Sequence, residues 1–449
     1  MKKIRFIVLF FAIIITVGAG TVYAKTSVIE KPGFKVYIDG KLGIYSLNPI
    51  VSEGKTFLPL NEFLINMGVQ NDGSQIIWNS SEKSVTIKKD GINIYLQVGS
   101  KLAKVNDIST TLDTAPVIYK SKVFIPVTFI AKSFGKNVTW DGRTNSIIIG
   151  ERPDSKVKQV IVSSAEEFVK EIEADKRILL KPGKYDLSSI KQNDSKDNKV
   201  TWKEVEDGKE LNISDISNLT IEGPGTEIAE ILIKPRYAEI IHFSNCSNIV
   251  IKNIKAGHTP DVYMCDAGVL DFEKCNDITI DSSELYGCGS IGLQATNTKR
   301  LDCINTKINH CSLRAIELNN CESTKFSGCK ISDHEAYSNI VYINNSKDTT
   351  FEQCELSNNN YFEWGFFEVL GESNLLIEKC KIENNKQPGD DTWEDNAYFF
   401  KTKDYLSKSE SKIIVRNTDL SNNKCDYLYD NVDSVTFENC IKSGNTWKE

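Results

Sequence analysis

Six polar residues recur at matching places along the C-terminal two-thirds of this chain. They are His242, Asp271, Gln294, Glu317, Tyr342 and Glu368, and each stands between two apolar residues. In a β-strand such residues face away from the core, because successive side chains alternate between the two faces. Carboxylates, an amide, an imidazole and a phenol suit sugars, whose hydroxyls need polar partners and whose C–H faces stack on aromatic rings. We interpret the column as a carbohydrate-binding groove; the alternative is a solvated strand face on which any polar residue serves.

Carboxylates at this spacing predict glycoside hydrolysis as one chemistry. Asp271 and Glu317 are two repeats apart, as are Glu317 and Glu368, which places their Cα atoms ~9.6 Å apart. Side-chain tilt can bring either pair to the separation of roughly 6.5–9.5 Å that inverting hydrolases use. We therefore take Asp271, Glu317 and Glu368 as candidate catalytic residues.

A polysaccharide lyase is the second chemistry, and it needs a base and a cation beside the uronate carboxylate. His310 and Arg314 enter the segment that carries Glu317, so we add both to the candidate catalytic set. For substrate binding we expect His242, His258, Gln294 and Tyr342. Asp261, Asp266 and Asp271 are candidate ligands for Ca²⁺, which prefers oxygen donors. No other cofactor is expected.

These residues belong to a repeating pattern that predicts the fold. Strand anchors recur at Ile221, Ile251, Ile280, Cys303, Phe326, Phe351, Ile377, Val415 and Phe437. The spacing drifts around the twenties, and Asn, Asp, Ser and Gly fill the turns, which is typical of a solenoid. A leucine-rich repeat would show Leu at fixed internal positions, and this sequence does not. We predict a single-stranded right-handed parallel β-helix over residues 159–449.

All 12 cysteines lie between Cys246 and Cys440 and follow the same repeat. Cys329, Cys354, Cys380 and Cys440 each come three residues after an anchor, in one column with Ser283, Thr306 and Thr418. Small side chains in such a column stack inside the coil, where free cysteine acts as a small buried hydrophobe. We favour free thiols. Disulfides between neighbouring rungs remain open, since the rung spacing permits them. Stacked single columns do not converge into a tetrahedral metal site.

Residues 34–151 contain a duplicated unit of a different kind. Lys55-Thr-Phe-Leu-Pro-Leu is echoed 67 residues later by Lys122-Val-Phe-Ile-Pro-Val. Each copy leads into an amphipathic stretch that ends at Gly68 or Gly135, a residue suited to a helix C-terminus. A Trp-led alternating strand pair follows each. Two copies of this unit predict a small α+β domain.

The duplicated unit resembles the copper amine oxidase N-terminal domain, also called a stalk domain, of secreted proteins from Gram-positive bacteria. The resemblance implies a surface spacer or wall-attachment module. We expect no copper there, because all four histidines lie elsewhere and the domain has no cysteine.

Residues 152–158 read as a linker, and the segment after it predicts a strand, a short helix capped by Ser163 or Ser164, and a Pro-Gly-x-Tyr turn. This opening resembles the N-terminal cap of pectate-lyase-like β-helix proteins, which covers the open end of the solenoid. The resemblance favours lyase chemistry by fold analogy only. The calcium-and-arginine signature of true pectate lyases has no match in the sequence.

Residues 1–24 read as a cleaved signal peptide: Lys2, Lys3 and Arg5 precede an apolar run and a Val-Tyr-Ala cleavage site. Cleavage takes the formal charge from −7 to −10. A nucleic-acid partner is not expected at that charge, because phosphate backbones require a basic face. We expect a monomer that is secreted, extracellular or attached to the cell wall, with no membrane segment after cleavage.

The sequence therefore predicts a mainly β protein with two domains, and it leaves the function open. One hypothesis is a carbohydrate-active or carbohydrate-binding β-helix acting on a polysaccharide or cell-wall glycan, as a lyase or a glycoside hydrolase. The other is a non-catalytic surface or wall-associated adhesion protein that uses the solenoid as a display surface.

Overall fold

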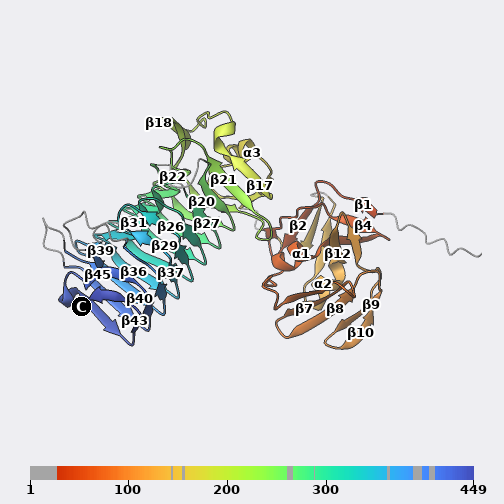
Figure 1. The fold of residues 1–449 in the computed structure, drawn as a ribbon. Helices are drawn as coiled ribbons and strands as arrows, with labels where there is room; N and C mark the ends of the chain where they lie inside the picture. Colours follow the sequence, from red (N-terminus) through yellow and green to blue (C-terminus); the bar gives the residue numbers. More distant parts are fainter. Residues whose placement is uncertain are drawn as a thin grey trace, which may run out of the picture.

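The computed structural model describes residues 28–142, 145–153, 157–259, 266–287, 289–361, 365–387, 397–403 and 410–449. The predicted signal peptide lies outside these residues. Two parts are visible in Figure 1: a compact N-terminal domain on the right, and an elongated solenoid that runs from the cap near α3 (Ala165–Lys170) to the C-terminus. None of the helices in the described ranges is both long and apolar enough to span a membrane.

The N-terminal domain consists of three sheets and two short helices, α1 (Leu60–Asn66) and α2 (Val127–Ser133). The first sheet has the order β1 (Val28–Glu30), β4 (Ile50–Ser52), β5 (Lys55–Pro59), β12 (Lys122–Pro126) and β11 (Val117–Tyr119). The second has the order β10 (Ile108–Thr111), β9 (Leu102–Val105), β8 (Ile92–Gln97), β7 (Ser84–Lys89) and β6 (Ile76–Asn79). The third has the order β13 (Val138–Asp141), β14 (Ser146–Ile149), β2 (Lys35–Ile38) and β3 (Lys41–Leu42). The α+β prediction is confirmed.

Three long sheets form the solenoid, and we call them S1, S2 and S3. S1 contains β15 (Lys158–Val162), β16 (Lys176–Leu180), β20 (Ser217–Glu222), β23 (Ser247–Lys252), β26 (Asn276–Asp281), β29 (Lys299–Ile304), β32 (Glu322–Ser327), β36 (Lys347–Glu352), β40 (Asn374–Glu378), β43 (Lys412–Arg416) and β46 (Val435–Glu438). S2 contains β17 (Gly183–Asp186), β21 (Ala229–Ile233), β24 (Lys255–His258), β27 (Glu284–Tyr286), β30 (Lys307–Asn309), β33 (Lys330–Ser332), β37 (Glu355–Ser357), β41 (Lys381–Glu383), β44 (Asp419–Ser421) and β47 (Ile441–Ser443). S3 contains β18 (Val200–Val205), β19 (Gly208–Ser214), β22 (Ile241–Ser244), β25 (Leu270–Glu273), β28 (Ile291–Thr296), β31 (Arg314–Asn319), β35 (Val341–Asn344), β39 (Gly365–Leu370), β42 (Tyr398–Lys401), β45 (Lys424–Tyr429) and β48 (Thr446–Lys448).

Smaller elements complete the solenoid: two 3-10 helices, η1 (Leu187–Ser189) and η2 (Val432–Ser434), and the pair β34 (Glu335–Ala336) and β38 (Asn360–Tyr361). Apart from the antiparallel pair β18–β19, the strands within S1, S2 and S3 pair in parallel. The predicted right-handed parallel β-helix is confirmed, and the helix α3 of its cap is N-capped by Ser164, one of the two predicted capping residues.

The predicted register also holds. The S1 anchors pair with one another in unbroken order from Ile221 to Phe437. Each coil bends at single residues in the left-handed conformation, among them Asn245, Asn297, Asn320 and Asn345 between S3 and S1. Asparagine tolerates this backbone conformation better than other non-glycine residues, which explains its frequency in the turns.

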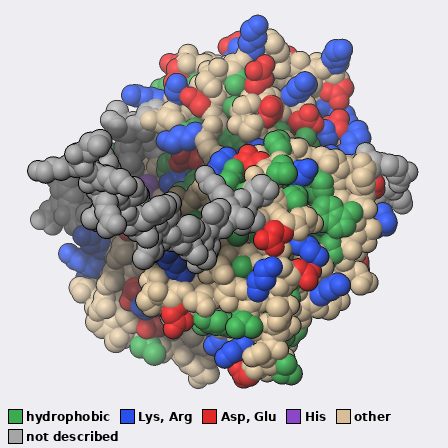
Figure 2. Space-filling model, turned by 90° about the vertical axis from the view of Figure 1, so that its right-hand side faces the viewer, with side chains coloured by type: hydrophobic (Ala, Val, Ile, Leu, Met, Phe, Trp, Pro, Cys, Tyr) green, Lys and Arg blue, Asp and Glu red, His purple; other side chains and the backbone are tan. Residues whose placement is uncertain are grey.

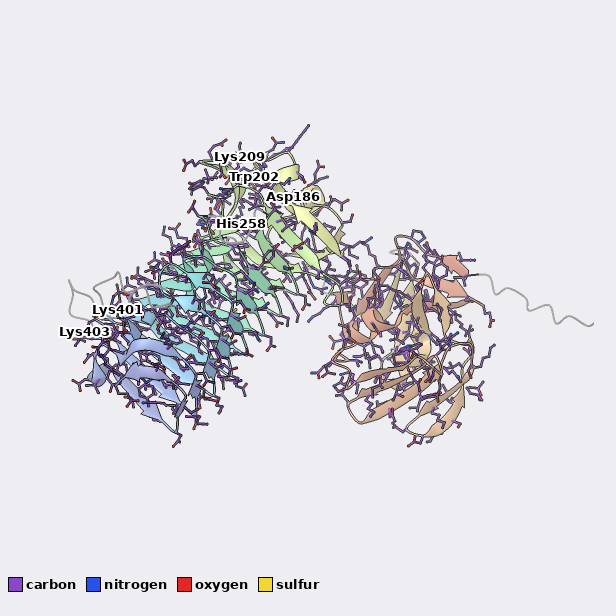
Figure 3. All side chains as sticks on the ribbon, viewed as in Figure 1. Asp186, Trp202, Lys209, His258, Lys401 and Lys403 are labelled. Atoms are coloured by element: carbon purple, nitrogen blue, oxygen red, sulfur yellow. The ribbon has the colours of Figure 1, made fainter. Side chains whose placement is uncertain are left out.

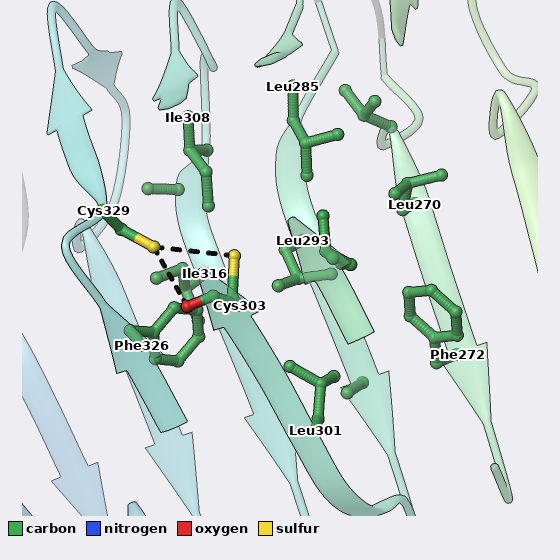
Figure 4. Packing of buried hydrophobic residues seen from close by; sticks show 14 of the residues in the cluster. Leu270, Phe272, Leu285, Leu293, Leu301, Cys303, Ile308, Ile316, Phe326 and Cys329 are labelled. Atoms are coloured by element: carbon green, nitrogen blue, oxygen red, sulfur yellow. Dashed lines mark hydrogen bonds between the residues drawn. The ribbon is translucent and has the colours of Figure 1, made fainter. Parts of the chain in front are cut away.

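The cysteine columns line the interior, as predicted, and they have a hydrogen-bonding role as well. The backbone N–H of Cys246 donates to Cys275 Sγ at 3.4 Å, and that of Cys354 to Cys380 Sγ at 3.3 Å. Hydroxyls take the same place elsewhere: Cys380 N–H donates to Thr418 Oγ1 at 3.2 Å. The column thus accepts N–H groups that the turns leave unpaired inside the coil. Figure 4 shows Cys303 and Cys329 within the apolar core, with their sulfur atoms 3.8 Å apart.

A ladder of buried asparagines continues this scheme between S2 and S3. Asn359, Asn385 and Asn423 are fully buried and stack in successive coils. Asn385 accepts from the backbone N–H and the side-chain amide of Asn359 and donates to Leu356 O at 2.9 Å. Every rung satisfies polar groups of two coils, which fixes the stacking of the later repeats.

The N-terminal domain packs on the first coils of the solenoid. Leu42 and Ile44 form a buried cluster with Leu179 of β16. Arg177 donates to the backbone oxygen of Leu42 at 2.8 Å and bonds to Glu222, while Gln159 donates to Gly40 O at 2.7 Å. In later coils the place of Leu179 is taken by Glu222 and then Lys252, so the apolar side chain marks where the domain covers the sheet.

The ladder arrangement predicts the chemistry of the thiols. The ten described cysteines are free, nine of them buried, and Cys440 is partly accessible. In native protein we expect an alkylating reagent to modify Cys440 about 100-fold faster than buried Cys354, because Cys354 reacts only after local opening. Peptide mapping by mass spectrometry after a time course measures this ratio, and urea-unfolded protein is the control in which the difference disappears. Equal rates in native protein would contradict the buried ladder.

Candidate functional site

The outward column of S3 is the candidate functional face. Asn212, His242, Asp271, Gln294, Glu317, Tyr342, Glu368 and Lys401 pair in register along eight consecutive strands. The predicted six-residue column is therefore confirmed as one continuous row. Its residues are half-buried from Asn212 to Tyr342, but Glu368 and Lys401 are only 7% and 5% exposed.

The outward column of S2 has a different character. Lys184, Glu230, Lys255, Glu284, Lys307, Lys330, Glu355, Lys381 and Asp419 follow one another across the strands. Neighbouring charges pair, as Lys330 and Glu355 do at 2.7 Å. Exposed pairs of this kind contribute little energy each, and they leave a solvated face. The chemically varied residues are thus concentrated on S3.

His242 and Asp271 form a bonded pair at the start of the S3 column. His242 Nδ1 lies 2.7 Å from Asp271 Oδ2, and Glu273 Oε2 lies 4.0 Å from His242 Nε2. The hydrogen bond to Asp271 raises the pKa of His242 above its usual value, although burial opposes the rise. Asp271 Oδ1 is buried and accepts no hydrogen bond within the described part of the chain. This pair can hold or transfer a proton near neutral pH.

Glu239 lies close enough to Asp271 and His242 for their charges to affect its pKa. It was not among the candidate residues predicted from the sequence. Its backbone N–H donates to Glu210 Oε2 at 3.3 Å. Burial raises the pKa of the Glu239 carboxyl to about 7; a hydrogen bond from the Gly268 backbone opposes the rise, and the charges of Asp271 and Glu210 add to it. A Cβ atom at Gly268 would lie 2.7 Å from Glu239 Oε2, so only glycine leaves room for the carboxyl over the next coil.

The sequence feature that could have indicated Glu239 is its distance along the chain from Gly268. Glu239 precedes Gly268 by 29 residues, the same interval that separates His242 from Asp271. Glu239 lies three residues before the strand column, at the edge of the coil, where the alternation of strand side chains no longer predicts direction. A buried carboxyl with a raised pKa beside a second carboxyl group is an arrangement that suits acid–base catalysis.

Glu317 is held differently. Arg314 forms an ion pair with Glu317 Oε2, and Asn319 Nδ2 donates to Glu317 Oε1 at 2.9 Å. The Arg314 guanidinium also lies 4.5 Å from the centroid of the Tyr342 ring, a cation–π contact. The two candidate catalytic residues Glu317 and Arg314 thus neutralise each other on the face.

Glu368 is the most enclosed of the predicted acids. Lys401 Nζ lies 2.7 Å from Glu368 Oε1, and Asn339 bonds to Glu368 Oε2. Asn339 also accepts from Arg314 Nε at 2.7 Å, which joins the Glu317 and Glu368 pairs into one network. Glu368 lies in the outward column, as predicted, but Lys401 of the next coil buries it in an ion pair. This geometry favours a structural part for Glu317 and Glu368, since each carboxylate is already compensated.

The candidate residues His258 and His310 do not belong to the outward S3 column. His258 is 3% exposed, and its Nε2 lies 2.8 Å from Ala238 O, so the predicted substrate contact is wrong. Burial lowers the pKa of His258. His310 adopts a left-handed backbone conformation at the S2–S3 corner and bonds to Asn309 at 2.6 Å. Figure 3 places His258 near the cap and Lys401 near the last coils of the solenoid.

The described residues do not form a calcium site of the predicted kind. Asp261 lies outside them, Asp266 is exposed, and Asp271 is bonded to His242. No group of three or more His, Cys, Asp or Glu side chains in the described ranges is arranged to hold a metal ion.

Comparison with known proteins supports the assignment of the N-terminal domain. Residues 37–149 match the family model described as copper amine oxidase N-terminal domain. That segment has neither His nor Cys, so its donor set does not fit copper. No curated protein matches the sequence significantly.

Solved structures similar to the chain include a pectate lyase, an alginate lyase and a surface adhesin. Pectate lyase Pel9A shares 11% identity over 65% of this chain and 77% of that chain, with a TM-score of 0.44. An alginate lyase from Paenibacillus sp. str. FPU-7 shares 11% identity over 65% and 98%, with a TM-score of 0.44. PfbA, a surface adhesin of Streptococcus pneumoniae, shares 10% over 65% and 71%, with a TM-score of 0.36. These likenesses concern the architecture, which the strand register establishes independently.

The carboxyl of Glu239 predicts a pH-dependent stability. A pKa raised from 4.5 to about 7 means that its favourable contribution is complete below pH 4.5 and is lost as the pH rises through about 7. Glu239→Gln mimics the protonated form, so the variant should gain about 1–3 kcal/mol over wild type between pH 5 and pH 8. Urea unfolding at both pH values measures the difference. Glu206 is exposed, so the control variant Glu206→Gln should not change how the free energy of unfolding depends on pH. A stability difference between Glu239→Gln and wild type that is the same at both pH values would contradict the burial argument.

The His242–Asp271 bond predicts a titration change. Asp271→Asn removes the charge that stabilises imidazolium, so the pKa of His242 should fall by about one unit. NMR titration of the histidine ring protons measures it, with Glu273→Gln as the matched control, because Glu273 lies 4.0 Å from His242 Nε2. An unchanged His242 pKa in Asp271→Asn would mean that the pair is not formed in solution.

Proposed function

We propose that the solenoid binds an extracellular polysaccharide along the S3 column and hydrolyses it at Glu239, His242 and Asp271. One observation carries the proposal: the neighbouring carboxyl groups of Glu239 and Asp271 each have a buried oxygen that accepts no hydrogen bond from the described residues. Burial raises the pKa of Glu239 to about 7, which suits a general acid. Hydrolysis requires one acid that protonates the leaving oxygen and one carboxylate that activates water or attacks the sugar. Glu239 supplies the acid and Asp271 the carboxylate.

His242 holds Asp271 in this scheme. Its bond to Asp271 Oδ2 leaves Oδ1 buried and without a hydrogen bond from the described residues, which favours a water or a sugar hydroxyl as the missing donor. Gln294 and Asn212 lie next to the pair in register and offer amides to sugar hydroxyls on both sides. The site then spans several coils, as binding of a polymer requires.

The charges of the column support a neutral or cationic glycan as substrate. Arg314 is bonded to Glu317, Lys401 to Glu368 and His242 to Asp271, so each of these cations is already compensated. A uronate would have to break one of these pairs to be neutralised. This favours hydrolysis over the lyase chemistry that His310 and Arg314 suggested.

A non-catalytic display role is the second candidate, and the network at Glu317 and Glu368 supports it. Arg314, Asn339 and Lys401 close this half of the face into ion pairs and hydrogen bonds. A rigid, charge-compensated wall suits adhesion or display. In either role we propose a secreted or wall-associated monomer, for which the predicted signal peptide is the support, with the N-terminal domain as its spacer.

Activity assays separate the two roles. On neutral plant and bacterial polysaccharides, Glu239→Gln and Asp271→Asn should each lower turnover by about 100-fold or more, because each removes one partner of the acid–base step. Glu284→Gln on S2 is the matched control and should leave turnover unchanged. Reducing-end release measures cleavage, and co-sedimentation measures binding.

Binding without cleavage by wild type would establish the display role. Full turnover in both variants would remove the proposed site, and cleavage with a new double bond absorbing in the ultraviolet would identify a lyase instead.

A further inference from the structure

The duplication in the N-terminal domain creates two equivalent pockets. Strands β5 and β12 pair antiparallel, with Phe57 opposite Pro126 and Pro59 opposite Phe124. Because Phe57 and Phe124 are equivalent residues of the two copies, as are Pro59 and Pro126, this pairing has local two-fold symmetry. Each pocket is then built from the strand of one copy and the helix start of the other.

The first pocket, which we call the Lys122 pocket, has a volume of about 390 Å³ and is lined by Lys122, Asn61, Glu62 and Trp78. Thr226 and Glu227 of the solenoid also line it. Lys122 Nζ lies 2.5 Å from Glu227 Oε1, 3.0 Å from Glu62 Oε1 and 2.7 Å from Ser46 Oγ. A carboxylate from an acidic loop is therefore seated on this lysine.

The second pocket, which we call the Lys55 pocket, has a volume of about 350 Å³ and is lined by Lys55, Leu112, Asp113, Phe129 and Lys132. Lys55 is the equivalent of Lys122, and Asp113 takes the place of Ser46: Lys55 Nζ lies 2.6 Å from Asp113 Oδ2. Both side chains of this pair are exposed, at 46% and 75%, and an ion pair in water is worth little. Lys55 can therefore exchange Asp113 for another carboxylate at small cost.

The two pockets differ at positions that set the ligand. Glu62 of the Lys122 pocket is replaced by the half-buried Phe129 in the Lys55 pocket, where Leu112 of the lining is buried. The Lys55 pocket lacks the second carboxylate and gains Lys132, so it is more cationic and more apolar than its counterpart. In Figure 2, which views the molecule from the side on which the N-terminal domain lies, apolar and charged side chains alternate over the surface.

We propose that the Lys55 pocket is a docking site for an acidic loop of another polypeptide. The loop presents a glutamate to Lys55 and Lys132 and an adjacent apolar residue to the half-buried Phe129. The solenoid segment 223–228, Gly-Pro-Gly-Thr-Glu-Ile, exemplifies this chemistry, because its Glu227 is bound by the equivalent lysine and is followed by the exposed Ile228. The domain is then a two-sided connector: one pocket holds the solenoid of the same chain, and the other holds a partner.

The test uses the chain without its predicted signal peptide (residues 25–449) and a capped synthetic peptide of segment 223–228. Ligand-observed saturation-transfer NMR suits the weak affinity expected of a short linear peptide, which lacks the high effective concentration of the tethered loop. We expect transfer to the glutamate and isoleucine protons of the peptide. Lys55→Ala should weaken binding about five-fold, the effect of losing one ionic contact. Phe129→Leu should weaken it less, and the exposed Lys104→Ala should not change it.

A peptide with glutamine in place of glutamate should lose most of the transfer. Several outcomes would overturn the proposal: no transfer to wild type, equal transfer to Lys55→Ala, or loss in Lys122→Ala with none in Lys55→Ala, which would place the peptide in the other pocket. Chemical-shift changes caused by inorganic phosphate but not by the peptide would make the site an anion site only. Circular dichroism confirms that each variant is folded.

Discussion

Every coil of the solenoid must pair its backbone with the next coil in three sheets at once. This constraint sets the direction of each side chain, because a shift of one residue in any strand would exchange the inner and outer faces. It also leaves N–H groups unpaired at the bends, inside an apolar core. The Cys, Ser and Thr column and the asparagine ladder accept these N–H groups, so the buried polar residues serve the stacking of coils. Without them the bends would carry a desolvation penalty in every repeat.

The same stacking divides the S3 face into two halves. In the later coils Glu317, Glu368, Arg314 and Lys401 close into ion pairs, with Asn339 between them. In the early coils Asp271 has one imidazole partner and Glu210 pairs with Lys203, but Glu239 Oε2 accepts no hydrogen bond from the described residues. Charge compensation is thus complete in one half and incomplete in the other. Burial, with a smaller effect from nearby acids, raises the pKa of Glu239, and the proposed acid–base site therefore lies near the cap.

The N-terminal domain is also built by duplication, but its two copies form a pair of pockets and not a stack of coils. Its two lysine pockets are related by the symmetry of β5 and β12, yet only the Lys122 pocket meets the solenoid. Since a two-fold symmetric domain cannot place both pockets on one neighbour at a single contact, the second pocket faces elsewhere. The apolar contact of Leu42 and Ile44 with Leu179, together with the bonds of Arg177, fixes which pocket is used by the chain itself.

Sequence alone determined the repeat, the register and the inward columns of this protein. Anchors such as Ile251 and Phe351 recur at intervals that the pairing confirms, because strand alternation is a local rule that a single sequence displays. His258, Glu239 and the partners of Glu317 and Glu368 were beyond that rule. Glu239 and Asn339 lie where coils bend, and Lys401 reaches Glu368 from 33 residues away, so their contacts depend on how neighbouring coils stack. Burial and charge pairing arise between coils, and only the tertiary structure decided them.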